Sequence, residues 1–132
     1  KEIQINSPTV QNNTHFIGVV ENMSELYPVT DTLIHPTLGD TYGMVVLEAM
    51  SHKLPVIVSS SEYCGFSEHL NNEEAVILNN PTDSQEISMS IQTLNNQLEL
   101  RNKISENGFK KSKTINWGNT TNKTLKAYKE IL

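Results

Sequence analysis

Short apolar runs, rich in Val and Ile and flanked by turn residues, recur between residues 14 and 78. Runs of this kind are typical of β-strands, and they predict strands at residues 14–18, 32–35, 55–59 and 75–78. Helical periodicity predicts helices at residues 23–29, 43–53, 83–96, 98–113 and 119–132, with a weaker one at 67–71. Strands that alternate with helices imply right-handed crossovers, so we expect an α/β fold with a Rossmann-like, three-layer parallel sheet.

Two residues give local signals for where helices begin and end. Asp83 follows Pro81 and Thr82 and is a favourable N-cap for the helix at 83–96. Gly108 lies inside the stretch 98–113, and we expect it to interrupt that helix before Phe109.

The size and the first residues of the chain bear on its domain organisation. With 132 residues and 36% hydrophobic content, the chain suits one domain at 1–132 and leaves no room for two. It starts at Lys1 and leads almost directly into the alternating run Ile3-Gln4-Ile5. We therefore expect it to be a piece of a longer protein.

Charge and cysteine content exclude several classes of function. The net charge is -5, and the basic residues are scattered except at 110–113, which argues against a nucleic-acid partner. No apolar run approaches the ~18 residues of a transmembrane segment, and the start lacks a signal-peptide pattern. The single cysteine, Cys64, excludes an internal disulfide framework and fits a reducing compartment, so a cytoplasmic location is expected.

The segment 31–59 carries the most informative chemistry. A predicted strand leads into a loop with Pro and Gly, and a helix opens where that loop ends. In an open parallel sheet, ligands bind beyond the carboxyl ends of the strands, where a helix N-terminus offers free N–H groups and the positive end of its dipole. This arrangement predicts an anion site at Met44 and Val45.

Two carboxylates accompany this helix, and each has two interpretations. Glu48 interrupts a helix that is apolar nearly all round, so we expect it to be buried and to face a bonding partner. It either contacts a ligand, or pairs with a basic side chain or a neighbouring loop. Asp40 either contacts the same ligand or serves only as the helix N-cap. Spacing alone leaves both questions open.

The same stretch resembles the donor-binding signature of family 4 glycosyltransferases. The matching motifs are Pro36-Thr37, the segment 40–43, the segment 44–50 with its Leu-Glu-Ala-Met, and Leu54-Pro55-Val56. Residues 15–20, 81–83 and 115–117 extend the resemblance over most of the chain. Within the family, Cys64-Gly65-Phe66 and His35-Pro36 are similar to the bacterial lipopolysaccharide-core glucosyltransferases.

This resemblance implies a specific enzyme. The chain would be the C-terminal, nucleotide-sugar-binding half of a two-domain GT-B fold. The whole enzyme would be a retaining, metal-independent glycosyltransferase that needs no cofactor and moves a hexose from a nucleoside-diphosphate sugar, such as UDP-glucose, to a glycan or lipopolysaccharide-type acceptor. The acceptor-binding N-terminal domain would lie outside this chain, so the chain alone would be inactive. A cytoplasmic enzyme of this kind would be peripheral to the inner membrane face.

The resemblance also implies roles for individual residues. Glu48 would bond the ribose hydroxyls, and Asp40 the hydroxyls of the donor sugar, which makes them the catalytic-site carboxylates. The backbone amides of Tyr42 and Gly43 would face the sugar, and those of Met44 and Val45 the diphosphate. The remaining donor-binding positions are Gly18 and Val19 beside the base, and Thr37 and Gly65 at the border of the cleft.

The chain departs from the family pattern at two positions. Asp40 stands where the family has Glu, and Thr41 where it has Gly, which puts the identity of the donor in doubt. The basic residues that neutralise the diphosphate in the family would lie before Lys1. These departures favour an alternative, a non-catalytic nucleotide-sugar-binding or scaffolding domain. A sugar-nucleotide epimerase is disfavoured, because its catalytic acids would have to lie elsewhere.

No metal site is expected from the sequence. The four histidines show no paired ligand spacing with Cys64, and an isolated histidine is more often packed or exposed than a ligand. They are His15, His35, His52 and His69.

Overall fold

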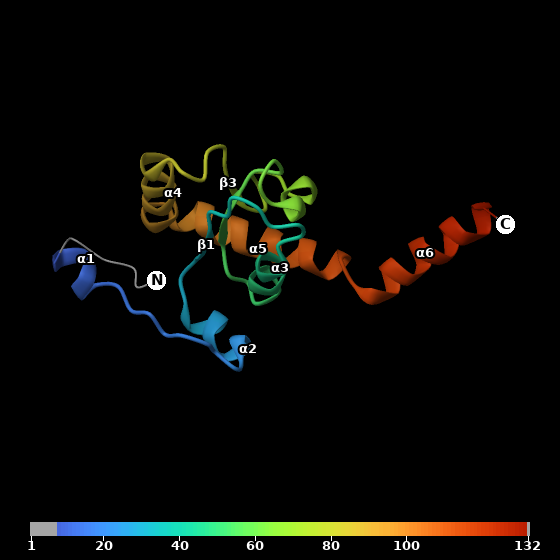
Figure 1. The fold of residues 1–132 in the computed structure, drawn as a ribbon, viewed down its shortest axis with the longest axis horizontal. Coiled ribbons are helices and arrows are strands. Elements are labelled where there is room, and N and C mark those ends of the chain that lie inside the picture. The colour runs from blue at the N-terminus through green and yellow to red at the C-terminus, as the bar shows by residue number, and fades with distance from the viewer. Residues whose placement is uncertain (1–7, 132) are drawn as a thin grey trace.

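The computed structural model describes residues 8–131, so the run Ile3-Gln4-Ile5 lies outside it. Its centre is a sheet of three parallel strands in the order β1 (Leu33–His35), β2 (Val56–Ser59) and β3 (Val76–Leu78) (Figure 1). These are three of the four predicted strands. β2 is buried along its whole length, as expected for the central strand of a sheet with helices on both faces.

The strand predicted at residues 14–18 is absent. Residues 14–20 form no regular structure, and Phe16 and Ile17 are 67% and 62% exposed. An apolar run becomes a strand only when a neighbouring strand takes up its hydrogen bonds, and none of the strands of the described chain pairs with it. Before it lies a short polar helix that the pattern did not predict, α1 (Pro8–Asn12), which buries nothing.

The helices cover the sheet as two layers. The predicted helix at 23–29 is α2 (Met23–Leu26) continued by a 3-10 turn, η1 (Tyr27–Val29), since Pro28 prevents regular helical bonding. The weakly predicted helix at 67–71 is a 3-10 turn, η2 (Gly65–His69). The others are confirmed as α3 (Met44–Ser51), α4 (Ser84–Asn96), α5 (Leu98–Thr114) and α6 (Trp117–Ile131).

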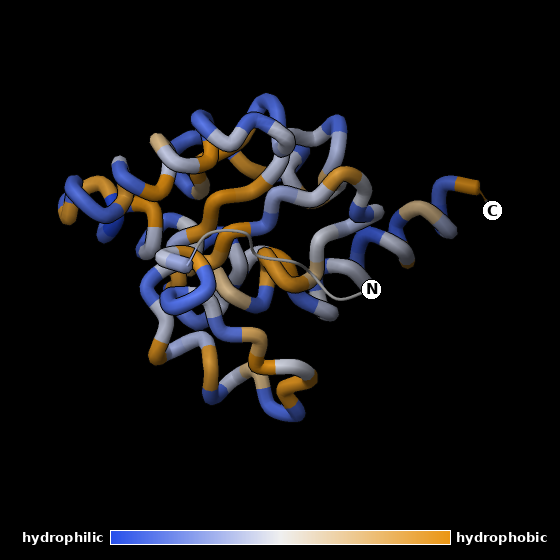
Figure 2. The backbone as a smooth tube through the Cα atoms, turned by 60° about the vertical axis from the view of Figure 1, so that its left-hand side comes forward, coloured by the Kyte–Doolittle hydropathy of each residue, from blue (hydrophilic) through white to orange (hydrophobic). Residues whose placement is uncertain are grey.

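Two hydrophobic clusters lie on opposite faces of the sheet. Val56 and Val58 face a cluster built with α3 and Tyr27, whereas Ile57 faces a second cluster built with α4 and α5. Figure 2 shows the apolar strands at the centre of the body, with polar segments around them. The alternation of β2 between the two clusters confirms the three-layer, Rossmann-like α/β fold.

Gly108 does not interrupt a helix. α5 runs through it, and Gly108 is buried where α5 crosses α3. A Cβ atom at this position would lie 3.2 Å from the carbonyl oxygen of Glu74 and 3.2 Å from Cε of Met50. The glycine therefore serves the close approach of the helices, and the helix-breaking interpretation was wrong. Asp83, by contrast, caps α4 as predicted, accepting from the amides of Gln85 and Glu86.

The last helix stands away from the body. α6 begins after a break at Ile115 and Asn116, and the amide of Asn119 donates to Oδ1 of Asn116 at 2.9 Å. α6 buries none of its residues and projects from the sheet and its helices (Figure 1). None of the described helices has the length and apolar character needed to cross a membrane.

The turn after α3 generates a stability prediction. Lys53 is the one non-glycine residue of the described chain with a positive φ, at 60°. The left-handed conformation costs a residue with a Cβ about 1–2 kcal/mol, part of which glycine loses again through its greater freedom when unfolded. We expect Lys53→Gly to be more stable than Lys53→Ala by about 1 kcal/mol in chemical denaturation.

The alanine variant is the matched control, because both substitutions remove the lysine side chain and its 2.6 Å ion pair with Glu106. Equal stability of the two variants would show that the backbone of this turn carries no strain.

Candidate active site

The loops that follow β1 and β2 are joined at one edge of the sheet. β1 ends at His35 and β2 at Ser59, and because the strands are parallel, both ends lie at the same edge. The buried Ser59 hydroxyl donates to the carbonyl of Thr37 at 2.8 Å, and the Ser67 hydroxyl donates to the carbonyl of Ser59 at 2.6 Å. A polar residue in the core thus holds the loop in which Thr37 lies.

Asp40 is fixed at this edge through its backbone. Its amide donates to the carbonyl of Tyr63 at 2.8 Å, and its own carbonyl accepts from the amide of Gly65 at 3.0 Å. These two bonds form a parallel bridge between Asp40 and Cys64. The β1–α3 loop is therefore paired with the β2–η2 loop as a short continuation of the sheet.

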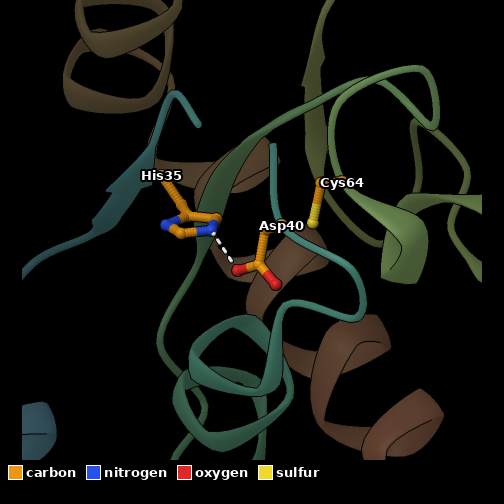
Figure 3. A group of neighbouring side chains, drawn as sticks. All are labelled: His35, Asp40 and Cys64. Carbon is orange, nitrogen blue, oxygen red and sulfur yellow. Dashed lines mark hydrogen bonds and ion pairs between the residues drawn. The ribbon is translucent and has the colours of Figure 1, made fainter. Parts of the chain in front are cut away.

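The carboxylate of Asp40 is held at both oxygens. Oδ1 accepts from the amides of Gly43 at 2.7 Å and Tyr42 at 3.1 Å, while Oδ2 lies 3.0 Å from Nε2 of His35 (Figure 3). The Gly43 hydrogen bond, followed by that of His35, lowers the pKa of Asp40 below its ordinary value. The group is thus an oriented, ionised acceptor at neutral pH.

The interpretation of Asp40 as the N-cap of α3 is wrong. The N-cap is Gly43, in the left-handed conformation with φ of 79°, and the side chain of Asp40 bonds amides that precede the helix. Val46 donates to the carbonyl of Gly43 at 3.0 Å. The amides of Met44 and Val45 donate to no acceptor within residues 8–131. Two N–H groups at the start of this helix are therefore free to bond an anion.

Two glycines allow this loop arrangement. A Cβ on Gly43 would lie 2.6 Å from Sγ of Cys64, and one on Gly65 would overlap the carbonyl oxygen of Thr41. Thr41 itself has no positive φ. The replacement of the family glycine at position 41 therefore imposes no left-handed strain on the loop.

Glu48 is exposed, which corrects the expectation of a buried carboxylate. α3 turns one face to the core, with Val46, Ala49 and Met50 buried, and leaves Met44 53% exposed. α3 packs against the sheet and α5 and leaves its remaining side open, so its apolar stretch is not surrounded. Glu48 therefore lies one turn beyond Met44 on the open side of the helix.

Tyr27 is the bonding partner of Glu48. Its hydroxyl donates to Oε2 of Glu48 at 3.1 Å, although its ring is buried in the core. Burial, together with the bond to Glu48, raises the pKa of Tyr27 to about 12. The tyrosine therefore remains a donor throughout the physiological pH range. No sequence pattern links Tyr27 to Glu48, because the two residues lie on different elements 21 positions apart.

The structure brings most of the predicted donor-binding positions together and leaves two apart. Gly18 and Val19 lie in the exposed coil before α2, with Val19 97% exposed and Gly18 at φ 69°. The others lie on the joined loops and the first turn of α3, namely Thr37, Asp40, Tyr42, Gly43, Met44, Val45 and Gly65.

A hollow of about 300 Å³ adjoins this edge without including either carboxylate. It lies between the loop and the end of α5, and Tyr42 forms one wall. Its other lining residues include Lys111, Asn116 and Lys123. Asp40, which is half-buried, and Glu48, which is exposed, lie outside it.

Comparisons with known proteins agree with the resemblance seen in the sequence. The family model described as "Glycosyl transferases group 1" matches residues 2–111. The lipopolysaccharide glucosyltransferase WaaG of Escherichia coli K12 is 27% identical over 99 residues, which are 74% of this chain and 26% of that protein. The O-antigen chain mannosyltransferase B of E. coli is 28% identical over 120 residues, which are 86% of this chain and 29% of that protein.

A solved structure shows the same fold. Sucrose-phosphate synthase from Thermosynechococcus elongatus superposes with a TM-score of 0.79 at 20% identity, over 93% of this chain and 31% of that one. The chain thus spans about a quarter to a third of the length of these three proteins.

The lowered pKa of Asp40 predicts a pH dependence of stability. Ionised Asp40 stabilises the fold above the ordinary pKa of an aspartate, and this contribution is lost as the pH falls through the lowered pKa. We expect Asp40→Asn to unfold more easily than the wild type at neutral pH, with the difference disappearing in acid. Denaturation curves across the acid range measure this.

His35→Gln separates the causes, because the Gly43 hydrogen bond is the larger one and should keep the pKa of Asp40 lowered in an NMR titration. A constant stability difference between Asp40→Asn and wild type at every pH would contradict the assignment.

Proposed function

Because the chain belongs to the group 1 glycosyl transferase family, we propose that it is the donor-binding domain of a retaining, GT-B glycosyltransferase. The observation that carries the proposal is the pair of free amides at Met44 and Val45, at the carboxyl edge of a parallel sheet. In this position they would bond the diphosphate of a nucleoside-diphosphate sugar, with the helix dipole adding a favourable field. Because this contact uses backbone donors, donor binding would need no metal ion.

Glu48 would bond the ribose hydroxyls of the same donor. It lies on the open side of α3, one turn from Met44, and Tyr27 holds one of its oxygens at 3.1 Å. The other oxygen remains available to a ligand. Since the ring of Tyr27 is fixed in the core, the carboxylate would be oriented before the nucleotide arrives.

Asp40 would bond the hydroxyls of the donor sugar. Its Oδ1 is engaged by Tyr42 and Gly43, so the contact would go through Oδ2, next to His35. A direct contact of the Tyr42 and Gly43 amides with the sugar would require the sugar to displace Oδ1. Thr37 and Gly65 border this position, while Gly18 and Val19, in their exposed coil, would meet the base.

The reaction would be dominated by positioning and electrostatics. Transfer requires that negative charge on the departing diphosphate be stabilised, and the free amides of Met44 and Val45 would supply that stabilisation. A UDP-hexose such as UDP-glucose is the donor we propose, and a lipopolysaccharide-type glycan the acceptor. Support comes from the relatives that act on lipopolysaccharide and O-antigen, one a glucosyltransferase and the other a mannosyltransferase. Acceptor binding would require a further domain, and a cytoplasmic site of action fits the free, buried Cys64.

One observation favours the alternative of a non-catalytic binding domain. Both oxygens of Asp40 already have partners in the chain, so the carboxylate has a structural role without any sugar. Such a domain would bind the nucleotide without preferring its sugar ester, so the affinities for UDP and UDP-glucose in an Asp40→Asn variant separate the two functions.

The contact of Glu48 with the nucleotide can be tested by mutation. Glu48→Gln should weaken the binding of UDP and UDP-glucose alike, by about 10- to 150-fold, because a hydrogen bond to a charged group contributes roughly 1.5–3 kcal/mol. Calorimetry in the presence of a chelator measures both affinities.

Tyr27→Phe is the matched control, since it removes the partner of Glu48 and keeps the carboxylate. It should weaken the binding of both ligands less than Glu48→Gln does. Unchanged affinities in a folded Glu48→Gln protein would return Glu48 to a structural role.

The contact of Asp40 with the sugar can be tested in the same way. Asp40→Asn should leave the affinity for UDP nearly unchanged and abolish the preference for UDP-glucose over UDP. The ratio of the two affinities is the useful quantity, because a general loosening of the loop affects both ligands equally and cancels. If the ratio in the mutant equals that of the wild type, Asp40 does not contact the sugar.

A further inference from the structure

The topology of the sheet brings together three side chains that no sequence spacing links. His35 is the last residue of β1, Cys64 follows the end of β2, and Asp40 lies in the loop after β1. Their side chains converge at one point of the sheet edge (Figure 3), with Nε2 or Nδ1 of His35, a carboxylate oxygen of Asp40 and Sγ of Cys64 all within 4.8 Å of one another.

From this cluster we infer that His35, Asp40 and Cys64 form a binding site for a thiophilic divalent cation such as Zn²⁺. One imidazole nitrogen, one thiolate and one carboxylate oxygen make a donor set that suits Zn²⁺ and does not suit Mg²⁺ or Ca²⁺, which prefer oxygen ligands. Three protein ligands leave a fourth position open. Water can reach the cluster to fill that position, because the side chains of His35 and Asp40 are 23% and 30% exposed.

The backbone fixes the cluster more firmly than a meeting of flexible side chains would. The parallel bridge between Asp40 and Cys64 sets the distance between their two loops. Cys64 is fully buried, and its Sγ packs so closely against Gly43 that no Cβ fits there. Sulfur is therefore a fixed ligand, around which the two more exposed side chains adjust.

The adjustment required is small. Ligand atoms bound tetrahedrally to zinc at roughly 2.0–2.3 Å are about 3.5 Å apart, so the widest pair must approach by roughly 1 Å. His35 and Asp40 already lie 3.0 Å apart, and a cation between them replaces their hydrogen bond. On binding, the Cys64 thiol gives its proton to the solvent as the metal–sulfur bond forms.

The site has a consequence for the donor that rests on the proposed function. The cation takes the same Asp40 oxygen, Oδ2, that we assign to the donor sugar, while the Met44 and Val45 amides stay free. Zn²⁺ therefore lowers the affinity for UDP-glucose and leaves the affinity for UDP unchanged. The cation acts as an inhibitor of sugar recognition, since donor binding itself needs no metal.

The test uses Co²⁺ as a spectroscopic probe and Zn²⁺ as its competitor, with the whole chain in metal-free buffer. We expect one Co²⁺ per chain, a sulfur-to-cobalt charge-transfer band, and displacement by Zn²⁺. Cys64→Ser should abolish the band, and His35→Gln should weaken binding at least tenfold. His15→Gln is the matched control, because it removes an imidazole from the exposed coil, and it should bind like the wild type.

Circular dichroism without metal shows whether each variant is folded. If Cys64→Ser does not fold, the binding of Co²⁺ by His35→Gln tests the cation site. Binding without the charge-transfer band, or equal binding by wild type and a folded His35→Gln, would overturn the cation site. UDP binding measured in the presence of a chelator does not depend on the cation site. If the wild-type chain does not bind UDP under these conditions, the proposed function is overturned and the cation site is unaffected.

Discussion

The site depends on one constraint, the parallel pairing of β1 with β2. Because the two strands run in the same direction in adjacent positions, both leave the sheet at the same edge, where their loops continue the pairing through Asp40 and Cys64. The hydroxyl of Ser59, buried at the end of β2, donates to the carbonyl of Thr37 and so holds the loop that follows β1. A change in strand order would separate Cys64 from Asp40 and His35, which belong to the β1 segment.

The sequence predicted the parts of the structure that a local pattern can determine. β1, β2, β3 and the long helices follow from apolar periodicity, and so does the fold. The prediction of a strand at 14–18 is wrong, because an apolar pattern does not show whether a partner strand is present. The prediction that Gly108 interrupts a helix is wrong because its role comes from the approach of another helix. The prediction that Glu48 is buried is wrong because the apolar pattern at 43–53 does not show that one side of the helix stays open.

The candidate site combines a motif that is continuous in the sequence with residues that only the fold brings to it. The motif from Asp40 to Glu48 is continuous in the chain, so resemblance detected it and the free amides of Met44 and Val45 were foreseen. Tyr27 and Cys64 reach the site through the tertiary fold, and no spacing rule links them to it. Their contributions differ: Tyr27 orients the carboxylate of Glu48 from the core, and Cys64 packs against Gly43 in the loop.

The path of α5 has a consequence for how the domain unfolds. Its first half contributes Ile104 to the cluster on one face of the sheet, and its second half places Gly108 against Met50, which belongs to the cluster on the other face. The two clusters therefore share one rigid helix, and neither loses its packing without disturbing the other. Native-state hydrogen exchange should reveal the sheet and α3 to α5 as a single cooperative unit, while the amides of α6 exchange by local fraying.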